Sequence, residues 1–315
     1  MRLVVLYIVL LSIVIGNVNA DTSKVSLAVS QTVSHPALDE TLRGILDELN
    51  KQGFVIGDNL DYKYFCAQGD VILSNQIAAK IISNRPDYAI SIGTTSSQSL
   101  LNANRANDIP IIFSSVTDPV AAKLVKDLNA PEKNITGVSN FIDVGPQLDL
   151  FKKILPNLSK VGFVYNSGEV NSVKILQVLK EAAATRNIEI ITSVATKASD
   201  VSQGINKLVG KVDAIFISND NTALSAFSVI VKIALANKVP LFVSDTDLVS
   251  QGALASMGPS QYELGRQAGK MIVRLIKGEK ISNIRLEFPS KIDVVINEKI
   301  AKELGITIPK ELLKK

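Results

Sequence analysis

The 315-residue sequence has very little of several residues on which protein chemistry commonly depends. It contains one cysteine, one histidine and no tryptophan. A single cysteine permits no disulfide within the chain, and one histidine with one cysteine cannot build a Cys/His zinc site. Net charge is also slight, because 34 basic residues against 30 acidic ones give +4 without a block of one sign. We therefore expect no metal, no cofactor and no nucleic-acid partner.

The motifs of common enzyme classes are missing as well. The sequence has no Gly-x-Ser-x-Gly, no P-loop and no Gly-x-Gly-x-x-Gly. His35 is the only histidine that could act as a general base, but a lone histidine between Ser34 and Pro36 is more often a loop or helix-cap residue. We therefore predict a protein that is not an enzyme.

The first twenty residues predict export. After a positively charged start, residues 3–15 are almost wholly apolar, and Val18 and Ala20 occupy the −3 and −1 positions of a cleavage site before Asp21. The apolar run is shorter than the ~20 residues that span a bilayer. No cysteine follows it to accept a lipid. We expect residues 1–20 to be a cleaved signal peptide and the mature chain to be a soluble, unlipidated periplasmic protein.

Beyond residue 20, short β-type segments alternate with amphipathic helical stretches. In the first part of the chain the pattern predicts strands at 24–30, 61–66, 88–92 and 110–113, and helices at 37–51, 70–84 and 96–104. This alternation is typical of βαβ units and mainly parallel sheets.

The pattern then repeats. Residues 23–29, 87–92 and 109–114 resemble 159–165, 213–218 and 239–244, at offsets of 136, 126 and 130. A nearly constant offset over three segments in the same order predicts two similar α/β halves. Ligands of parallel sheets bind beyond the carboxyl ends of the strands, so we expect a ligand cleft between two Rossmann-like lobes.

Polar residues cluster in the segments that follow the predicted strands. The candidate ligand-binding residues are Ser34, His35, Thr94, Thr95, Ser115, Thr117, Asp118, Tyr165, Asn166, Glu169, Asp220, Asn221 and Asp245. Helix N-termini and hydroxyl groups suit a carboxylate, whereas the acidic side chains can accept hydrogen bonds from an ammonium group. Each of these residues could instead be a helix cap without any ligand.

The order of these segments resembles the tryptophan/tyrosine-type (TrpX-like) family of ABC transporter substrate-binding proteins. The resemblance is carried by Ser34-His35-Pro36-Ala37-Leu38-Asp39, Ile109-Pro110-Ile111-Ile112-Phe113, Val116-Thr117-Asp118-Pro119-Val120, Asn134-Ile135-Thr136-Gly137-Val138, Asp220-Asn221-Thr222, Tyr262-Glu263-Leu264-Gly265-Arg266-Gln267 and Gly305-Ile306-Thr307-Ile308-Pro309. These matches run in order through essentially the whole mature chain.

The resemblance implies a type I periplasmic-binding-protein (Venus-flytrap) fold that closes on an amino acid, aromatic above all, and delivers it to an inner-membrane permease. It assigns the ligand carboxylate to Thr94, Thr95 and Thr117, and the ammonium to Asp118 or Asp220. The rest of the pocket is expected to be formed by Ser34, Tyr165, Asn166, Glu169 and Asp245. We expect the protein to act as a monomer.

The resemblance also implies three crossings between the lobes, near 137–143, 256–261 and 286–291. Lobe 1 is then 21–139 plus 260–286, and lobe 2 is 140–259 plus 287–315. A sugar or other polar solute is an alternative ligand, and a sensor domain for a membrane receptor is an alternative role. An exported α/β enzyme is a third alternative, for which no nucleophile–base pair is found.

Overall fold

The structure of this protein, a computed structural model, describes residues 24–129 and 132–313. The predicted signal peptide, residues 1–20, lies outside the described residues. Within the described part, no helix is both long and apolar enough to cross a membrane.

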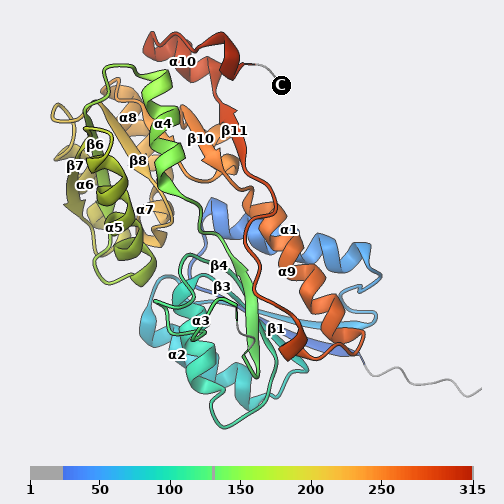
Figure 1. The fold of residues 1–315 in the computed structure, drawn as a ribbon. Coiled ribbons are helices and arrows are strands. Elements are labelled where there is room, and N and C mark those ends of the chain that lie inside the picture. Colours follow the sequence, from blue (N-terminus) through green and yellow to red (C-terminus); the bar gives the residue numbers. More distant parts are fainter. Residues whose placement is uncertain (1–23, 130–131, 314–315) are drawn as a thin grey trace, which may run out of the picture.

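Two sheets, each covered by helices, form two lobes (Figure 1). The first sheet, in lobe 1, is entirely parallel, with the order β2-β1-β3-β4-β5. Its elements are β1 (Val25–Gln31), α1 (Pro36–Lys51), β2 (Leu60–Cys66), α2 (Val71–Ser83), β3 (Tyr88–Ile92), α3 (Thr94–Ala103), β4 (Ile111–Val116) and β5 (Ile135–Ser139).

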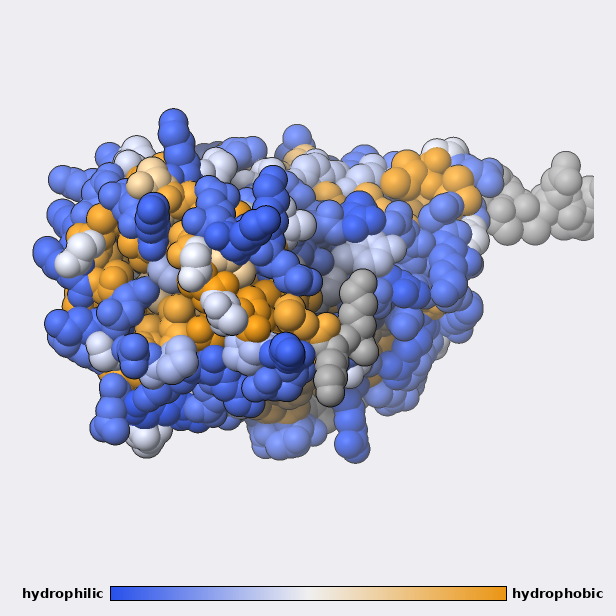
Figure 2. Space-filling model, turned by 90° about the horizontal axis from the view of Figure 1, so that it is seen from above, coloured by the Kyte–Doolittle hydropathy of each residue, from blue (hydrophilic) through white to orange (hydrophobic). Residues whose placement is uncertain are grey.

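The second sheet, in lobe 2, has the order β11-β10-β9-β8-β6-β7, and only β11 is antiparallel to its neighbour. Its strands are β6 (Lys160–Tyr165), β7 (Glu189–Val194), β8 (Ala214–Ile217), β9 (Leu241–Val243), β10 (Ala255–Gly258) and β11 (Asp293–Ile296). Its helices are α4 (Val144–Ile154), α5 (Val170–Ala184), α6 (Ala198–Asn206), α7 (Asn221–Ser225), α8 (Phe227–Ala236) and α10 (Glu298–Leu304). The end of lobe 2 that carries α10 shows apolar patches between mostly polar side chains (Figure 2).

The two sheets repeat one another, as the sequence predicts. The order β2-β1-β3-β4-β5 corresponds to β7-β6-β8-β9-β10, and the three similar sequence segments are the pairs β1/β6, β3/β8 and β4/β9. The prediction of two α/β lobes is therefore confirmed.

The chain passes between the lobes three times. It leaves lobe 1 between β5 and α4, returns between β10 and α9 (Gln261–Ile276), and leaves again before β11 (Figure 1). The first and third crossings are tied together, because the Ser139 amide donates to the Glu287 carbonyl at 2.9 Å and the Glu287 amide donates to the Gly137 carbonyl at 3.0 Å.

Helix α9 belongs to lobe 1 because it packs closely on α1. Gly44 and Gly265 let the two helix backbones meet, and a Cβ atom at Gly265 would lie 2.1 Å from the Thr41 carbonyl oxygen. The buried side of this pair includes Ile45, Leu264 and Ala268, which pack against β1 and β3 residues in one apolar core.

Two element bounds differ from the sequence prediction by more than one residue, and both differences concern the cleft. Helix α3 begins at Thr94 instead of residue 96, because Gly93 takes a φ of +88° and serves as the N-cap. Strand β4 continues to Val116 because its later residues pair with β5, with a bulge at Ser115, whose φ is +57°. Ser115 therefore lies within the strand, not in the loop after it.

Candidate functional site

The two lobes face each other across a cleft with two compartments. We call the larger one, with a volume of about 500 Å³, the outer chamber. Lobe 1 lines it with Thr32, Val33, Gln68, Gly69, Val71 and Thr95, and lobe 2 with 166–169, 196–198, Asn221, Thr222 and Ser225. Because both lobes supply walls, a molecule held there would contact both.

We call the smaller compartment the inner pocket. Its lining is mostly polar and consists of His35, Ala37, Leu38, Ser115, Thr117, Asn140, Asn171, Asn219, Asn221, Leu224, Asp245 and Gln261. Asn221 lines both compartments, so the inner pocket and the outer chamber are adjacent.

Several helix N-termini border the outer chamber, and those of α2 and α7 carry side-chain caps. At α3, which starts beside Thr95, the N-cap is a glycine and the Thr32 hydroxyl accepts only from the Ser96 amide, at 3.1 Å. At α6, the N-cap Lys197 side chain accepts no hydrogen bond from the helix. Helix α5 also lacks a side-chain cap and begins directly after Glu169. Free amide N–H groups and the positive end of a helix dipole attract an anion. These helix ends belong to both lobes, so the cleft favours a ligand with an anionic group.

Glu169 is the carboxylate in the lining of the outer chamber, and it also organises lobe 2. Its Oε2 accepts hydrogen bonds from the backbone and side-chain nitrogens of Asn221 at 3.0 and 2.7 Å. Its Oε1 accepts from the backbone nitrogen and hydroxyl of Thr222 at 3.0 and 2.7 Å. Glu169 thus caps the first turn of α7 and fixes Asn221 at the boundary of the two compartments.

Gln261 connects the lobes in the inner pocket. Its Oε1 accepts hydrogen bonds from the hydroxyls of Thr41 at 3.0 Å and Ser115 at 2.7 Å, both in lobe 1. Its Nε2 donates to Oδ1 of Asp245 in lobe 2 at 2.7 Å. Burial raises the pKa of Asp245 to about 7, with the hydrogen bond from Gln261 opposing this shift.

Two further contacts join the lobes in the inner pocket. His35 caps α1 through Nδ1, which accepts from the Leu38 amide, and its Nε2 lies 3.3 Å from Oδ1 of Asn221. Burial lowers the pKa of His35, which favours a neutral ring that donates from Nε2 to Asn221. The Asn219 amide donates to the Thr117 hydroxyl at 3.3 Å. The interpretation of His35 as a cap residue is confirmed.

Eight of the thirteen predicted residues line the two compartments. Thr95, Asn166, Glu169 and Asn221 line the outer chamber, and His35, Ser115, Thr117, Asn221 and Asp245 line the inner pocket.

The other five predicted residues are placed elsewhere, each for a physical reason. Thr94 is buried in the first turn of α3, and Ser34 donates to Oδ2 of Asp39 at 2.9 Å. The Tyr165 ring packs on Phe163 inside lobe 2, so that Asn166 is the first residue to reach the cleft.

Both carboxylates expected to bind an ammonium group have other partners. Asp220 is buried and accepts hydrogen bonds from the Asn166 and Ala223 amides at 2.6 and 2.7 Å and from the Ser172 hydroxyl. Burial raises the pKa of Asp220, and the negative charge of nearby Glu169 raises it further. Asp118 forms an ion pair with Lys174. Neither carboxylate lines the outer chamber or the inner pocket.

Sequence reasoning missed several lining residues, of which Gln261 is the most connected. The residues without a prediction include Gln68, Asn171, Lys197, Asn219 and Gln261. A signal for Gln261 was available, since the second predicted crossing ends at residue 261. The buried Oδ1 atoms of Asn171 and Asn219 have no hydrogen-bond partner among the described residues, so this pocket retains capacity for a polar group.

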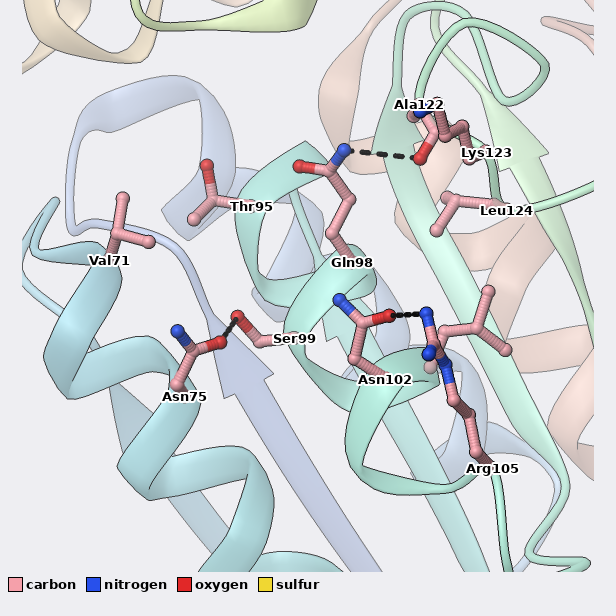
Figure 3. A pocket seen from close by; sticks show the side chains of 11 residues that line it. Val71, Asn75, Thr95, Gln98, Ser99, Asn102, Arg105, Ala122, Lys123 and Leu124 are labelled. Atoms are coloured by element: carbon pink, nitrogen blue, oxygen red, sulfur yellow. Dashed lines mark hydrogen bonds between the residues drawn. The ribbon is translucent and has the colours of Figure 1, made fainter.

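A further cavity of about 630 Å³ lies entirely in lobe 1, between α2, α3 and the loop after β4 (Figure 3). Many of its polar side chains bond to each other, such as Ser99 to Asn75 and Arg105 to Asn102 (Figure 3). It meets the outer chamber at Val71 and Thr95. Because one lobe forms all its walls, lobe closure would not enclose a molecule there.

Comparison with known proteins identifies relatives of the whole chain. A family model described as ABC transporter substrate binding protein matches residues 26–315. The chain is 35% identical over 281 residues to a tyrosine-binding protein of Clostridioides difficile (strain R20291), covering 89% of this chain and 81% of that protein.

Two solved structures are similar to this chain over most of its length but differ in their TM-scores. The chain is 35% identical to an ABC domain from Streptococcus pneumoniae in complex with L-Trp, with a TM-score of 0.87, covering 92% of this chain and 98% of that one. It is 37% identical to the ligand-free, open structure of a substrate-binding protein with adhesive properties from Clostridium difficile, with a TM-score of only 0.68, covering 90% and 96%. Identity and coverage are similar, and the lower TM-score belongs to the structure described as open. In the structure of this chain the lobes are in direct contact through the His35–Asn221 and Asn219–Thr117 hydrogen bonds.

The repeated sheets, the three crossings and the cleft agree with these comparisons and with the type I periplasmic-binding-protein fold. The chain belongs to the ABC transporter substrate-binding protein family.

Proposed function

We propose that this protein binds an aromatic amino acid between its lobes and delivers it to an ABC permease, without catalysis. The observation that carries the proposal is the outer chamber, where uncapped helix N-termini of both lobes meet beside one carboxylate. The tyrosine-binding and Trp-bound relatives support the choice of an aromatic side chain. The predicted signal peptide supports a periplasmic location.

In this proposal the ligand carboxylate lies at the start of α3. The Thr32 hydroxyl caps only the Ser96 amide, so the earlier amides of this helix have no side-chain acceptor among the described residues, and the Thr95 hydroxyl adds a donor. The amide groups at the start of α6, across the chamber, contribute to the same negative group when the lobes are closed. The carboxylate then replaces the missing caps of two helices.

The ammonium group lies toward Glu169 and Asn221. Glu169 keeps its position through its hydrogen bonds to α7, so its charge is in place before the ligand arrives. The ligand side chain packs on Val33 and Val71 of lobe 1. This assignment replaces Asp118 and Asp220 by Glu169 as the partner of the ammonium group.

Binding favours closure because the ligand contacts both lobes only in the closed form. Closure also forms the hydrogen bonds of Gln261 with Asp245 and of His35 with Asn221, which join the lobes directly. We propose that the closed surface is what the permease recognises and that the protein acts as a monomer.

The test is thermal unfolding of residues 21–315, refolded to remove any carried ligand, with each of the twenty amino acids and with common sugars. A ligand at 100 times its Kd adds about 2.7 kcal/mol, a shift of several degrees. A shift with Trp, Tyr or Phe supports the proposal. A shift with sugars alone overturns the amino-acid assignment and leaves the family intact.

Two matched variants then test the site. Thr95→Val keeps the shape of the side chain and removes its hydroxyl, so we expect affinity to fall about threefold to tenfold. Ser34→Ala removes a hydroxyl that lies outside both compartments and should leave affinity unchanged. Equal losses in the two variants would contradict this placement of the ligand.

A further inference from the structure

One ion pair joins the two lobes directly. Nζ of Lys174, on α5 of lobe 2, lies 3.2 Å from Oδ2 of Asp118, in the loop after β4 of lobe 1. Among residues 24–129 and 132–313, every other ion pair connects residues of the same lobe or lies along the last crossing. Lys174 and Asp118 therefore form the sole ion pair that must break when the described lobes separate.

The lobe 1 half of this pair is held rigidly. Oδ1 of Asp118 accepts hydrogen bonds from the amides of Val120 and Ala121 at 3.1 and 2.9 Å, both within lobe 1. These bonds do not depend on closure, so Oδ2 keeps its direction when the lobes move. Only the Lys174 side chain has to be ordered on closing, which lowers the entropic cost of forming the pair.

The pair is partly shielded from water and separate from the ligand site. The side chains are 31% exposed for Lys174 and 19% for Asp118. Neither residue lines the outer chamber or the inner pocket. The adjacent residue, Thr117, accepts a hydrogen bond from Asn219 of lobe 2 in the inner pocket. The ion pair therefore lies next to another direct contact between the lobes.

We propose that the Asp118–Lys174 pair is a latch that favours the closed form and slows ligand release without touching the ligand. Because it forms only when the lobes meet, it adds to the closed state alone. Its contribution should show in the population of the closed form and in the dissociation rate, and should weaken as salt screens the charges.

The closed population can be measured without a ligand. Val71 and Ser167 line the outer chamber from opposite lobes, so cysteines at these two positions, with Cys66→Ser, can be joined by a short bifunctional thiol reagent when the lobes close. The rate of crosslinking reports closure even when the closed form is rare. Variants are compared in this background at low salt and at about 1 M salt, where the Debye length is about 3 Å.

Lys174→Gln and Asp118→Asn each remove one charge, and asparagine retains the oxygen that accepts from Val120 and Ala121. We expect each to slow crosslinking about twofold to fivefold at low salt. The double variant should be no slower than either single one, and all rates should converge at high salt. Lys133→Gln, which breaks an exposed pair with Asp108 inside lobe 1, is the matched control and should have no effect.

Crosslinking at the wild-type rate in both single variants, or losses that add in the double variant, would overturn the latch. The same change is then made in the protein without the two introduced cysteines. There, Lys174→Gln should raise the dissociation rates of L-Trp and L-Tyr by the same factor and leave their association rates unchanged. Failure of both amino acids to bind would count against the proposed function alone, because crosslinking tests the latch in the free protein.

Discussion

Gly265 sits where the backbones of α1 and α9 touch, and replacing it with alanine should destabilise lobe 1. A Cβ atom there would lie 2.1 Å from the Thr41 carbonyl oxygen and 3.0 Å from the Ile45 amide nitrogen, whereas ordinary contact begins at 3.4 Å. Both neighbours are backbone atoms, so no side chain can turn away. Helix α9 must shift instead, and its first residue, Gln261, carries the hydrogen bond to Asp245.

The size of the effect follows from two opposing contributions. Extra volume in a well-packed interface costs about 1–3 kcal/mol. Alanine in place of glycine within a helix stabilises the folded chain by up to about 1 kcal/mol. This contact lies near the top of the overpacking range because neither backbone can relax locally, so we expect a net loss of about 2 kcal/mol. For a chain of this size that is a decrease in Tm of about 3 °C.

Gly204→Ala is the matched control, since the same change is made within α6. The nearest atom to a Cβ there is the Ser193 hydroxyl at 3.4 Å, which is ordinary contact. This variant should gain about 0.5–1 kcal/mol. Both changes can be followed by calorimetry and by far-UV circular dichroism. A Gly265→Ala protein that melts at or above the wild-type temperature would refute the reasoning.

Three other predictions concern charged groups. Burial raises the pKa of Asp245 to about 7 from 3.8, so the folded chain binds the proton of this carboxyl more tightly than the unfolded chain does. The free energy of unfolding should therefore fall as pH rises from about 4 to about 7. Asp245→Asn should make the free energy of unfolding, measured in urea titrations, less dependent on pH. Arg266→Met leaves the 1% exposed Glu48 side chain without its 2.9 Å partner, and should cost about 3 kcal/mol in urea unfolding, largely restored by adding Glu48→Gln. Glu169→Gln should weaken amino-acid binding about tenfold by calorimetry, because it removes the charge that we propose as the partner of the ammonium group.

Much of the fold could be predicted from the sequence because periodicity and topology determine it. Alternating strands and amphipathic helices dictate parallel sheets, and three similar segments place β1, β3 and β4 opposite β6, β8 and β9. The two bounds that differ by more than one residue have different causes. Strand β4 extends because β5 pairs with it, and α3 starts early because Gly93 adopts a positive φ.

The site could be predicted in position but not in role. Strand ends of both sheets meet at the cleft, so residues after strands were the right place to search. Which carboxylate lines the cleft was decided by the tertiary fold: Glu169 lines the outer chamber, whereas Asp220 is buried among its hydrogen-bond donors and Asp118 pairs with Lys174. Gln261 was missed although it follows the end of β10, because the chain crosses between the lobes there, and this crossing places it in contact with both lobes.

In our proposal, the helix ends in the cleft couple closure to ligand binding. The N-cap side chains of α1, α2, α4 and α9 accept from the first amides of these helices, whereas the N-cap residues of α3, α5, α6 and α8 do not, and α3 and α6 begin at the outer chamber. An uncapped helix end leaves amides that water must satisfy in the open form. A ligand carboxylate between α3 and α6 satisfies both ends only when the lobes come together, so the proposed ligand completes two helices by closing the protein.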